Sequence, residues 1–357
     1  MPFFALLASV AIATARPVQA QDSTQSNNSR LGVLPILGSA PETGLQYGLT
    51  VFRVYRPSAD SVTRPSVDQL AASNTARGQR KASFQTERWT EGNHWRLRAR
   101  LEYQDYPLPF FGIGSSTPSE AEERYRATGA AIHLQAHRRL RSATYLLTGY
   151  RFSHTTIGDL TPGSSLASGQ VTGSAGGNLS QLQGGLVRDS RDNIFSPHSG
   201  VLAQVVVTTS QAALGSDFSF TRLDVDLREY SRLKGFVIAS QLQFSSTNGA
   251  TPFDQLPSIG ADTAIRGYTR GRFRDQQLLS GQVELRTPTW RRLGVVAFTG
   301  VGVVTQDSTG LIDTLWHPSV GAGLRYILFR QERNAVRIDF AKGRRSSGLY
   351  IGLNEAF

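Results

Sequence analysis

The chain has 357 residues, no cysteine, a formal net charge of +11 at pH 7 and a pI near 10.3. The absence of cysteine excludes disulfides and thiolate metal sites. A charge this positive can indicate nucleic-acid binding, but the arginines are spread over alternating positions, without the clustered runs of a nucleic-acid tail. We therefore expect no nucleic-acid partner.

Residues 1–20 have the features of a signal peptide. An apolar run from Phe3 to Ala15 is followed by Val18-Gln19-Ala20, the small-x-small pattern that signal peptidase accepts. Cleavage there leaves residues 21–30 as a short segment before the first predicted strand. The remaining sequence has no run of about twenty apolar residues, which a membrane helix requires. We therefore predict a secreted precursor without a transmembrane helix.

From residue 31 to residue 357, apolar and polar residues alternate. Between Trp95 and Gln104 the odd positions carry the apolar side chains, and Arg96, Arg98, Arg100, Glu102 and Gln104 occupy the even ones. Such a strand has one face suited to lipid and one suited to water. The sequence predicts an all-β fold, a 16-stranded antiparallel transmembrane β-barrel. The predicted strands are 31–38, 43–56, 66–76, 79–90, 94–106, 123–140, 143–156, 179–189, 198–211, 218–232, 236–247, 276–288, 293–305, 315–329, 334–343 and 347–357.

The predicted connections differ in length between the two ends of the barrel. Those at one end include the longest: 107–122, 157–178 and 248–275. Those at the other end are short: 141–142, 233–235 and 330–333. Long extracellular loops and short periplasmic turns are typical of outer-membrane barrels, so this asymmetry favours such a barrel over a soluble β-sandwich. The barrel should be closed, because each unpaired N–H or C=O at an open edge is costly in hydrocarbon.

The arginines of such a barrel should lie in its polar lumen or on a surface facing anionic lipopolysaccharide. Solvated arginines without a specific ligand are the alternative.

A turn motif, Val187 to Asn193, lies between two predicted strands and is followed by a proline and a glycine. Asp and Asn side chains accept hydrogen bonds from nearby amides, while Pro and Gly fix the backbone dihedrals. We assign the motif a structural role in a tight periplasmic turn rather than ligand binding. The residues concerned are Asp189, Arg191, Asp192, Pro197 and Gly200.

Three further segments complete the set of motifs. Ile265-Arg266-Gly267-Tyr268 lies in the longest connection, and Gly321-Ala322-Gly323-Leu324-Arg325 lies on a later strand. The last predicted strand is amphipathic and ends on Phe357. Together with the turn motif, these segments resemble the bacterial surface antigen family, the BamA/TamA-type outer-membrane barrels that fold, insert or secrete other proteins.

The resemblance implies a docked loop and a targeting signal. In relatives the loop folds from outside into the lumen, and its arginine docks on the barrel wall. This implies that Arg266, Gly267 and Tyr268 dock beside Arg325. Phe357 resembles the C-terminal signal that the assembly machinery reads during biogenesis.

The acidic residue on which the family's arginine usually docks is missing here. The family's F-x-D-x-G strand reads Phe298-Thr299-Gly300-Val301-Gly302, with Gly300 in the acidic position. An unpaired buried arginine is costly, so Arg266 needs another acceptor. Alternation places Glu284 and Asp339 on the inward face of neighbouring strands, and Glu284 is our first choice.

A last resemblance concerns the N-terminal region. Pro35 and Pro41-Glu42-Thr43-Gly44, with Phe111-Gly112-Ile113-Gly114 later, resemble family members that lack periplasmic POTRA domains. Since only residues 21–30 separate the predicted cleavage site from the first strand, we expect a member of this kind.

The resemblance predicts an outer-membrane barrel of a Gram-negative bacterium with a role in inserting or translocating outer-membrane or secreted client proteins. The alternative is a passive channel or structural barrel without assembly activity. We expect no enzyme and no cofactor, because G-x-S-x-G, H-E-x-x-H and a phosphate-binding glycine loop are all absent. His133 and His137 are predicted to line the polar lumen rather than to bind metal.

Overall fold

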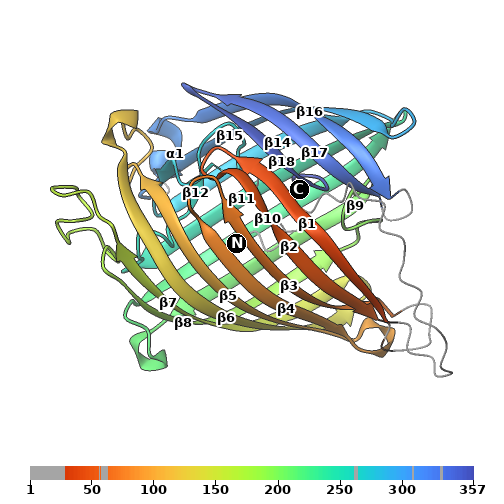
Figure 1. Cartoon of the computed structure of the whole chain (residues 1–357), viewed down its shortest axis with the longest axis horizontal. Coiled ribbons are helices and arrows are strands. Elements are labelled where there is room, and N and C mark those ends of the chain that lie inside the picture. Colours follow the sequence, from red (N-terminus) through yellow and green to blue (C-terminus); the bar gives the residue numbers. More distant parts are fainter. Residues whose placement is uncertain (1–28, 56, 58–62, 261–263, 308, 330–332) are drawn as a thin grey trace.

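The computed structural model describes residues 29–357, apart from 56, 58–62, 261–263, 308 and 330–332. The predicted signal peptide, 1–20, and most of the predicted segment 21–30 lie outside the described residues. In the described part, sixteen antiparallel strands form a closed barrel, as the alternation predicts (Figure 1). They are β1 (Arg30–Ala40), β2 (Gly44–Tyr55), β3 (Ser66–Thr75), β4 (Arg80–Trp89), β5 (Trp95–Phe110), β6 (Glu123–Arg141), β7 (Thr144–Gly158), β8 (Gly176–Asp189), β9 (Gly200–Ser210), β10 (Phe220–Leu233), β11 (Phe236–Gly249), β14 (Gln277–Arg286), β15 (Leu293–Thr305), β16 (His317–Phe329), β17 (Asn334–Gly343) and β18 (Ser346–Leu353).

Neighbouring strands in the barrel are neighbours in sequence, except where β11 pairs with β14 and where β18 meets β1. Between β11 and β14 the chain forms a separate two-stranded sheet, β12 (Ser258–Ile259) and β13 (Phe273–Arg274). The short helix α1 (Gly310–Asp313) follows β15. Three 3-10 turns, at Glu91–Asn93, Ser119–Ala121 and Ala212–Leu214, complete the regular structure.

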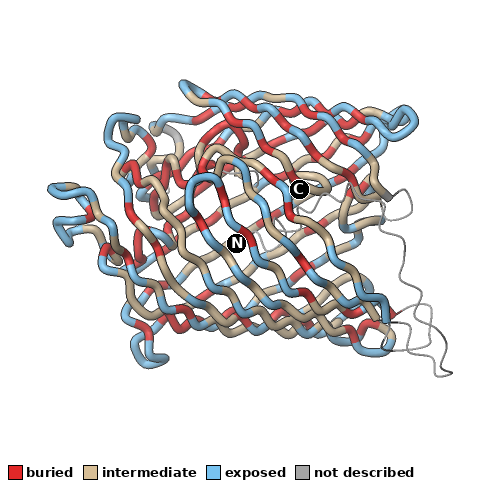
Figure 2. The backbone as a smooth tube through the Cα atoms, in the orientation of Figure 1, coloured by how far each residue is buried: buried red, intermediate tan, exposed pale blue. Residues whose placement is uncertain are grey.

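The two faces of the wall differ as the period-two pattern requires. On β14, Val283 and Leu285 are exposed on the outer face, whereas Gln282 and Glu284 are buried on the inner face. Figure 2 shows this alternation of exposed and buried positions around the barrel. No helix among the described residues is long and apolar enough to cross a membrane.

The two ends of the barrel differ in their connections. At one end β6 and β7 are joined through residues 142–143, and β10 and β11 through residues 234–235. The longer connections, 111–122, 159–175 and 250–276, lie at the other end. They extend beyond the strands or fold into the barrel interior. We call these the short-turn end and the long-loop end. By the rule for outer-membrane barrels, the short-turn end faces the periplasm.

The prediction of a last strand extending to residue 357 is wrong in its final four residues. The strand β18 ends at Leu353, and Asn354 has a φ of 62°, which turns the chain out of the wall. Phe357 is buried against Tyr230 and Ala239 on the inner face of the barrel. The Glu355 carboxylate holds this inward turn, because it accepts a hydrogen bond of 2.6 Å from Arg325.

Candidate functional site

The connection 250–276, which we call the lumen loop, contacts opposite sides of the barrel interior. On one side the Phe253 ring packs edge-on against Phe110 of β5 and Tyr125 of β6, each with a centroid distance of 5.2 Å. On the same side the Gly114 amide donates to the carbonyl of Arg274, at 2.8 Å. The segment around Arg266 lies on the other side, against β14 to β18. The loop therefore crosses the lumen near its long-loop end.

Arg266 occupies a pocket of opposite charge in the wall. Its side chain is inaccessible to solvent and forms ion pairs with Glu284 of β14 and, at 2.5 Å, with Asp339 of β17. The guanidinium carbon lies 3.5 Å from the centre of the Phe298 ring on β15. The structure thus brings Arg266 onto both carboxylates that the inward-facing pattern singles out, with an aromatic ring beneath.

The backbone next to Arg266 is also held by the wall. The Gly267 amide donates to the Tyr350 hydroxyl on β18 at 2.8 Å, and the Ser319 hydroxyl on β16 donates to the Arg266 carbonyl. Gly267 has a φ of 102°, and a Cβ there would lie 2.8 Å from the Gly343 amide nitrogen. Only glycine combines this dihedral with so close an approach.

Tyr268 anchors the loop a second time. Its hydroxyl donates to the Pro318 carbonyl at 2.7 Å and accepts from the Arg344 amide at 2.8 Å. Its ring lies against Gly343, where a Cβ would come within 2.4 Å of a ring carbon. The loop is therefore attached to three consecutive strands, β16, β17 and β18.

The missing acid at position 300 has a steric explanation. Ile265 of the loop is buried, and a Cβ on Gly300 would lie 3.0 Å from the Ile265 Cδ1 atom. Ile265 has a φ of 66°, which is unfavourable for a β-branched residue. The loop thus places an apolar side chain where the resemblance expects a carboxylate, and Glu284 and Asp339 supply the negative charge from other strands.

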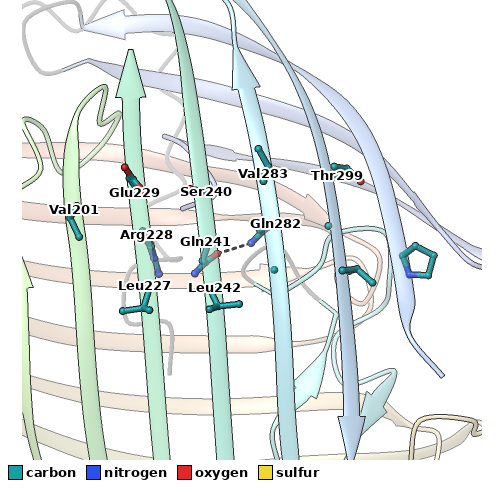
Figure 3. A pocket seen from close by; sticks show the side chains of 14 residues that line it. Val201, Leu227, Arg228, Glu229, Ser240, Gln241, Leu242, Gln282, Val283 and Thr299 are labelled. Carbon is teal, nitrogen blue, oxygen red and sulfur yellow. Dashed lines mark hydrogen bonds between the residues drawn. The ribbon is translucent and has the colours of Figure 1, made fainter. Parts of the chain in front are cut away.

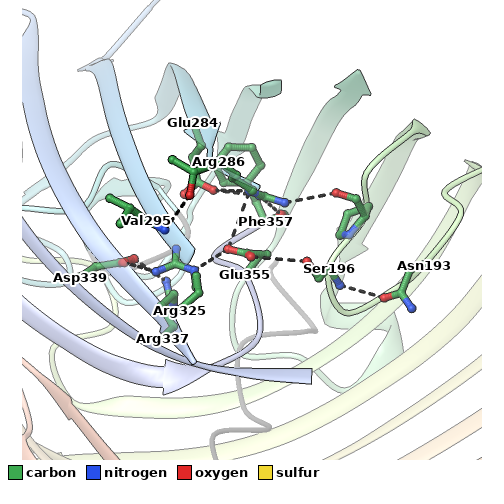
Figure 4. Close-up of polar contacts among 12 residues, drawn as sticks. Asn193, Ser196, Glu284, Arg286, Val295, Arg325, Arg337, Asp339, Glu355 and Phe357 are labelled. Carbon is green, nitrogen blue, oxygen red and sulfur yellow. Dashed lines mark hydrogen bonds and ion pairs between the residues drawn. The ribbon is translucent and has the colours of Figure 1, made fainter. Parts of the chain in front are cut away.

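Arg325, predicted to stand beside the docked loop, reaches Arg266 through a shared carboxylate. It pairs, at 2.5 Å, with the Asp339 carboxylate oxygen that does not contact Arg266, and with Glu355 at 2.6 Å. Arg286 links Glu284, at 2.8 Å, to Glu355, at 3.7 Å. Figure 4 shows the ion pairs that connect Glu284, Arg286, Glu355, Arg325 and Asp339. The charge cluster consists of Arg266, Glu284, Arg286, Arg325, Arg337, Asp339 and Glu355.

Several contributors to this site were not anticipated. Continued alternation along the predicted last strand would place Glu355 on the outward face, which gave no reason to expect it in the lumen. Tyr350, Ser319, Arg286 and Arg337 fall on inward-facing positions of their strands, and that alternation is the signal by which their place in the site could have been found. Phe298, on the strand expected to form the docking wall, does lie beneath the loop arginine.

The turn motif forms a compact turn with its polar groups satisfied. Arg191 donates two bonds to Asp189, at 2.8 and 2.9 Å. Gly200 has a φ of 103°, and a Cβ there would come within 2.3 Å of the Ser190 carbonyl oxygen. The Pro197 carbonyl accepts a bond from Arg286, at 3.3 Å. The turn therefore also contacts the charge cluster.

Asp192 closes the same turn. Its carboxylate accepts bonds from the amides of His198 and Ser199, at 2.8 and 3.1 Å, and from Arg333, at 2.7 Å. Partial burial favours the neutral acid, but these bonds and the positive charge of Arg333 outweigh it and lower the pKa of Asp192 to about 2. Asp192 therefore remains ionised at any physiological pH.

The first and last strands meet in a narrow seam. Both strands are described in full, and Ser39↔Ile351 is the single pair of residues that joins them. By contrast, β1 pairs with β2 along its whole length, from Arg30↔Val54 to Ala40↔Gly44. Pro35 lies within this ladder and has no backbone N–H to donate. Because the pairing with β2 continues past it, the missing N–H would have pointed toward β18.

Two other features of the wall carry no chemistry of this kind. A recess of about 710 Å³ lies across β10, β11 and β14 to β16, where Leu227, Leu242 and Val283 face lipid; the Gln241 and Gln282 side chains bond behind them at 2.6 Å (Figure 3). In the described part of the chain, no group of three or more His, Asp or Glu residues is placed to hold a metal ion. His133 bonds to Gln183 at 2.7 Å in the lumen wall.

Fold and site together define a closed membrane barrel whose lumen is crossed by an inserted, ion-paired loop. The family model of the Omp85 superfamily domain matches residues 69–350, and the chain belongs to this superfamily. It is an outer-membrane protein of the Gram-negative type, and the predicted resemblance to BamA/TamA-type barrels is confirmed.

Solved structures show the same fold at low sequence identity. BamA from Haemophilus ducreyi lacking POTRA domains 1–3 is 14% identical, with a TM-score of 0.63 over 91% of this chain and 70% of that chain. CdiB from Acinetobacter baumannii is 10% identical (TM-score 0.57; 94% and 60%), and CdiB from Escherichia coli is 9% identical (TM-score 0.57; 93% and 64%). This chain spans less than two thirds of either CdiB chain. Among curated proteins, no sequence matches it.

Proposed function

We propose that this barrel inserts or translocates other polypeptides at the outer membrane, and that it does so through the seam between β1 and β18. The observation that carries the proposal is the unpaired edge of β1. If the register of Ser39↔Ile351 continued, Asn354 to Phe357 would lie opposite Ile36 to Val33. These four residues instead turn into the lumen, so that within the part of the chain that the structure describes most of the β1 edge has no strand partner on that side.

An unpaired strand edge is a template for another strand. Each backbone N–H or C=O without a partner costs several kcal/mol in hydrocarbon, so an incoming strand that pairs with β1 gains this energy. Val33 and Leu31 are 57% and 75% exposed beside this edge. A client with alternating apolar residues could therefore pair with β1 and cover the apolar surface beside it.

The docked loop supports the same function. Its anchors lie on β16, β17 and β18 and on β14, which are strands on the β18 side of the seam. They hold this side of the wall together when β1 separates from it. BamA and CdiB share the fold, and the family resemblance implies folding, insertion or secretion of other proteins. We propose an activity of that class, with client proteins as partners of this chain.

The alternative, a passive channel, fits the lumen loop less well. The loop contacts β5 and β6 through Phe253 and the opposite wall through Arg266, so it lies across the path of a diffusing solute. A channel that conducts steadily, with conductance unaffected by deletion of residues 262–272, would favour this alternative.

A disulfide lock across the seam tests the proposal. Because the chain lacks cysteine, Ser39→Cys with Ile351→Cys introduces a single pair, and Phe340→Cys with Leu349→Cys locks the neighbouring β17–β18 ladder as a control. The readout is the rate at which a urea-unfolded eight-stranded barrel folds into vesicles that contain each variant. We expect the seam lock to reduce this rate to that of protein-free vesicles, with recovery on reduction, and the control lock to have no effect. Unchanged insertion by the oxidised seam lock would rule the seam out.

A further inference from the structure

The charged residues of the outer surface are distributed unequally between the two ends. Every exposed charged side chain in the described part lies near one end or the other, which leaves the middle of the wall apolar. At the long-loop end, acids and bases are present in equal numbers: Arg77, Arg80, Arg124, Lys342, Arg344 and Arg345 against Glu120, Glu122, Asp159, Asp217, Asp307 and Asp313.

The short-turn end is strongly basic. Its exposed acids are Glu91, Asp192 and Glu229, and Asp192 is already paired with Arg333. We call the outward-facing and turn bases there the basic rim: Arg53, Arg138, Arg141, Arg188, Lys234, Arg291 and Arg292. Arg64, which lies over the buried Trp89 ring, and Arg232, which pairs with Asp192, do not belong to it. The surplus of positive charge on this surface therefore lies at the short-turn end, which faces the periplasmic side.

Aromatic rings are interleaved with this rim. Arg138 lies over the Trp95 ring, at 5.8 Å from its centre, on the next strand, and Arg291 lies over Trp290, at 5.1 Å. Arg53 lies over Tyr55, at 5.2 Å. The rings of Trp95 and Trp290 are 40% and 69% exposed. Trp and Tyr rings are favoured at the headgroup level of a bilayer, so the arginines above them stand at the level of the lipid phosphates.

We infer that the basic rim binds anionic phospholipid headgroups in the leaflet at the short-turn end. The headgroup phosphodiester accepts two parallel bonds from a guanidinium, so the arginines of the rim suit this ligand. Outward-facing Arg53, Arg138 and Arg188 extend from strand ends toward the interface and can reach a phosphate without leaving the wall. The inference is independent of any client, since it concerns the lipid that surrounds the barrel.

Lipid binding to the full chain in detergent tests the inference. Native mass spectrometry measures the ratio of bound phosphatidylglycerol to bound phosphatidylcholine in the wild type and two variants. The rim variant carries Gln at Arg53, Arg138, Arg141 and Arg188; the control carries Gln at Arg77, Arg80, Arg344 and Arg345, with the same loss of charge. A basic residue near an anionic surface contributes about 1 kcal/mol, or about fivefold in affinity. We expect the rim variant to lose its preference for phosphatidylglycerol by more than tenfold and the control to keep it.

Two results would overturn the inference. One is a wild type with no preference for phosphatidylglycerol, and the other is an equal loss in both variants, which would indicate a response to net charge alone. Quenching of tryptophan fluorescence by brominated phosphatidylglycerol, compared with brominated phosphatidylcholine, gives a measurement on the wild type that does not depend on the folding of a variant. Equal quenching by the two lipids would also contradict a headgroup site beside Trp95 and Trp290.

Discussion

Removing a carboxylate from the charge cluster should destabilise the barrel more than removing Arg266. Breaking a buried ion pair costs about 3–5 kcal/mol, because it leaves a charge without its partner. In Arg266→Met, Glu284 keeps Arg286 and Asp339 keeps Arg325, at 2.8 and 2.5 Å. The expected loss is therefore at the low end, about 3 kcal/mol.

Asp339→Asn removes the carboxylate that contacts Arg266, Arg325 and Arg337. The cluster has four arginines and three carboxylates, so this change increases its excess of positive charge, and we expect a loss near 5 kcal/mol. The free energy of unfolding is measured from urea titrations in lipid vesicles, with the folded barrel followed by its altered migration on a gel. Glu284→Gln is the intermediate case. A smaller loss for Asp339→Asn than for Arg266→Met would refute the reasoning, because it would mean that losing an arginine costs this cluster more free energy than losing a carboxylate.

Three further outcomes follow from the same geometry. Gly300→Asp should displace Ile265, whose Cδ1 atom lies 3.0 Å from the new Cβ, and should increase trypsin cleavage of the lumen loop in intact cells by at least tenfold; equal cleavage would mean that the loop accommodates the acid. Gly343→Ala should do the same by expelling the Tyr268 ring, with stability lowered by about 1–3 kcal/mol, measured in the same urea titration. Asp192→Asn should be less stable than the wild type at pH 7. Because the pKa of Asp192 is lowered to about 2, this difference in stability should persist to about pH 4 and be lost as the pH falls through about 2. A difference in stability that does not change with pH would show that the carboxylate charge is not the cause.

The strands could be predicted because each carries its own information. A residue on a half-buried strand alternates in polarity with its neighbours, so Glu284 and Asp339 could be assigned to the lumen without knowledge of any contact. The docking of Arg266 was implied by the family resemblance of its loop, and the cost of an unpaired buried guanidinium then pointed to these two carboxylates as its acceptors. The strand positions therefore need only local pattern, whereas the position of the loop needs the resemblance.

The side chain that fills the space beside Gly300 and the strand pairing at the seam could not be predicted in the same way. That Ile265 fills the space beside Gly300 depends on the path of a loop that leaves the wall and returns to it. The single pair Ser39↔Ile351 depends on the register between the two ends of the sequence, which no local pattern encodes. Both features arise only when the barrel closes.

Phe357 shows why polarity alone misplaced the end of the chain. The alternation of β18 stops at Leu353, because Asn354 and Glu355 are both polar and Ala356 and Phe357 are both apolar. Glu355 favours the inward turn, because on a continued strand it would share the outward face of Leu349 and Leu353, whereas in the lumen it meets Arg325 and Arg286. The same turn that buries Phe357 removes the residues that would pair with β1. The burial of the tail and the open edge on which the proposed function rests are thus two consequences of one pair of charge contacts.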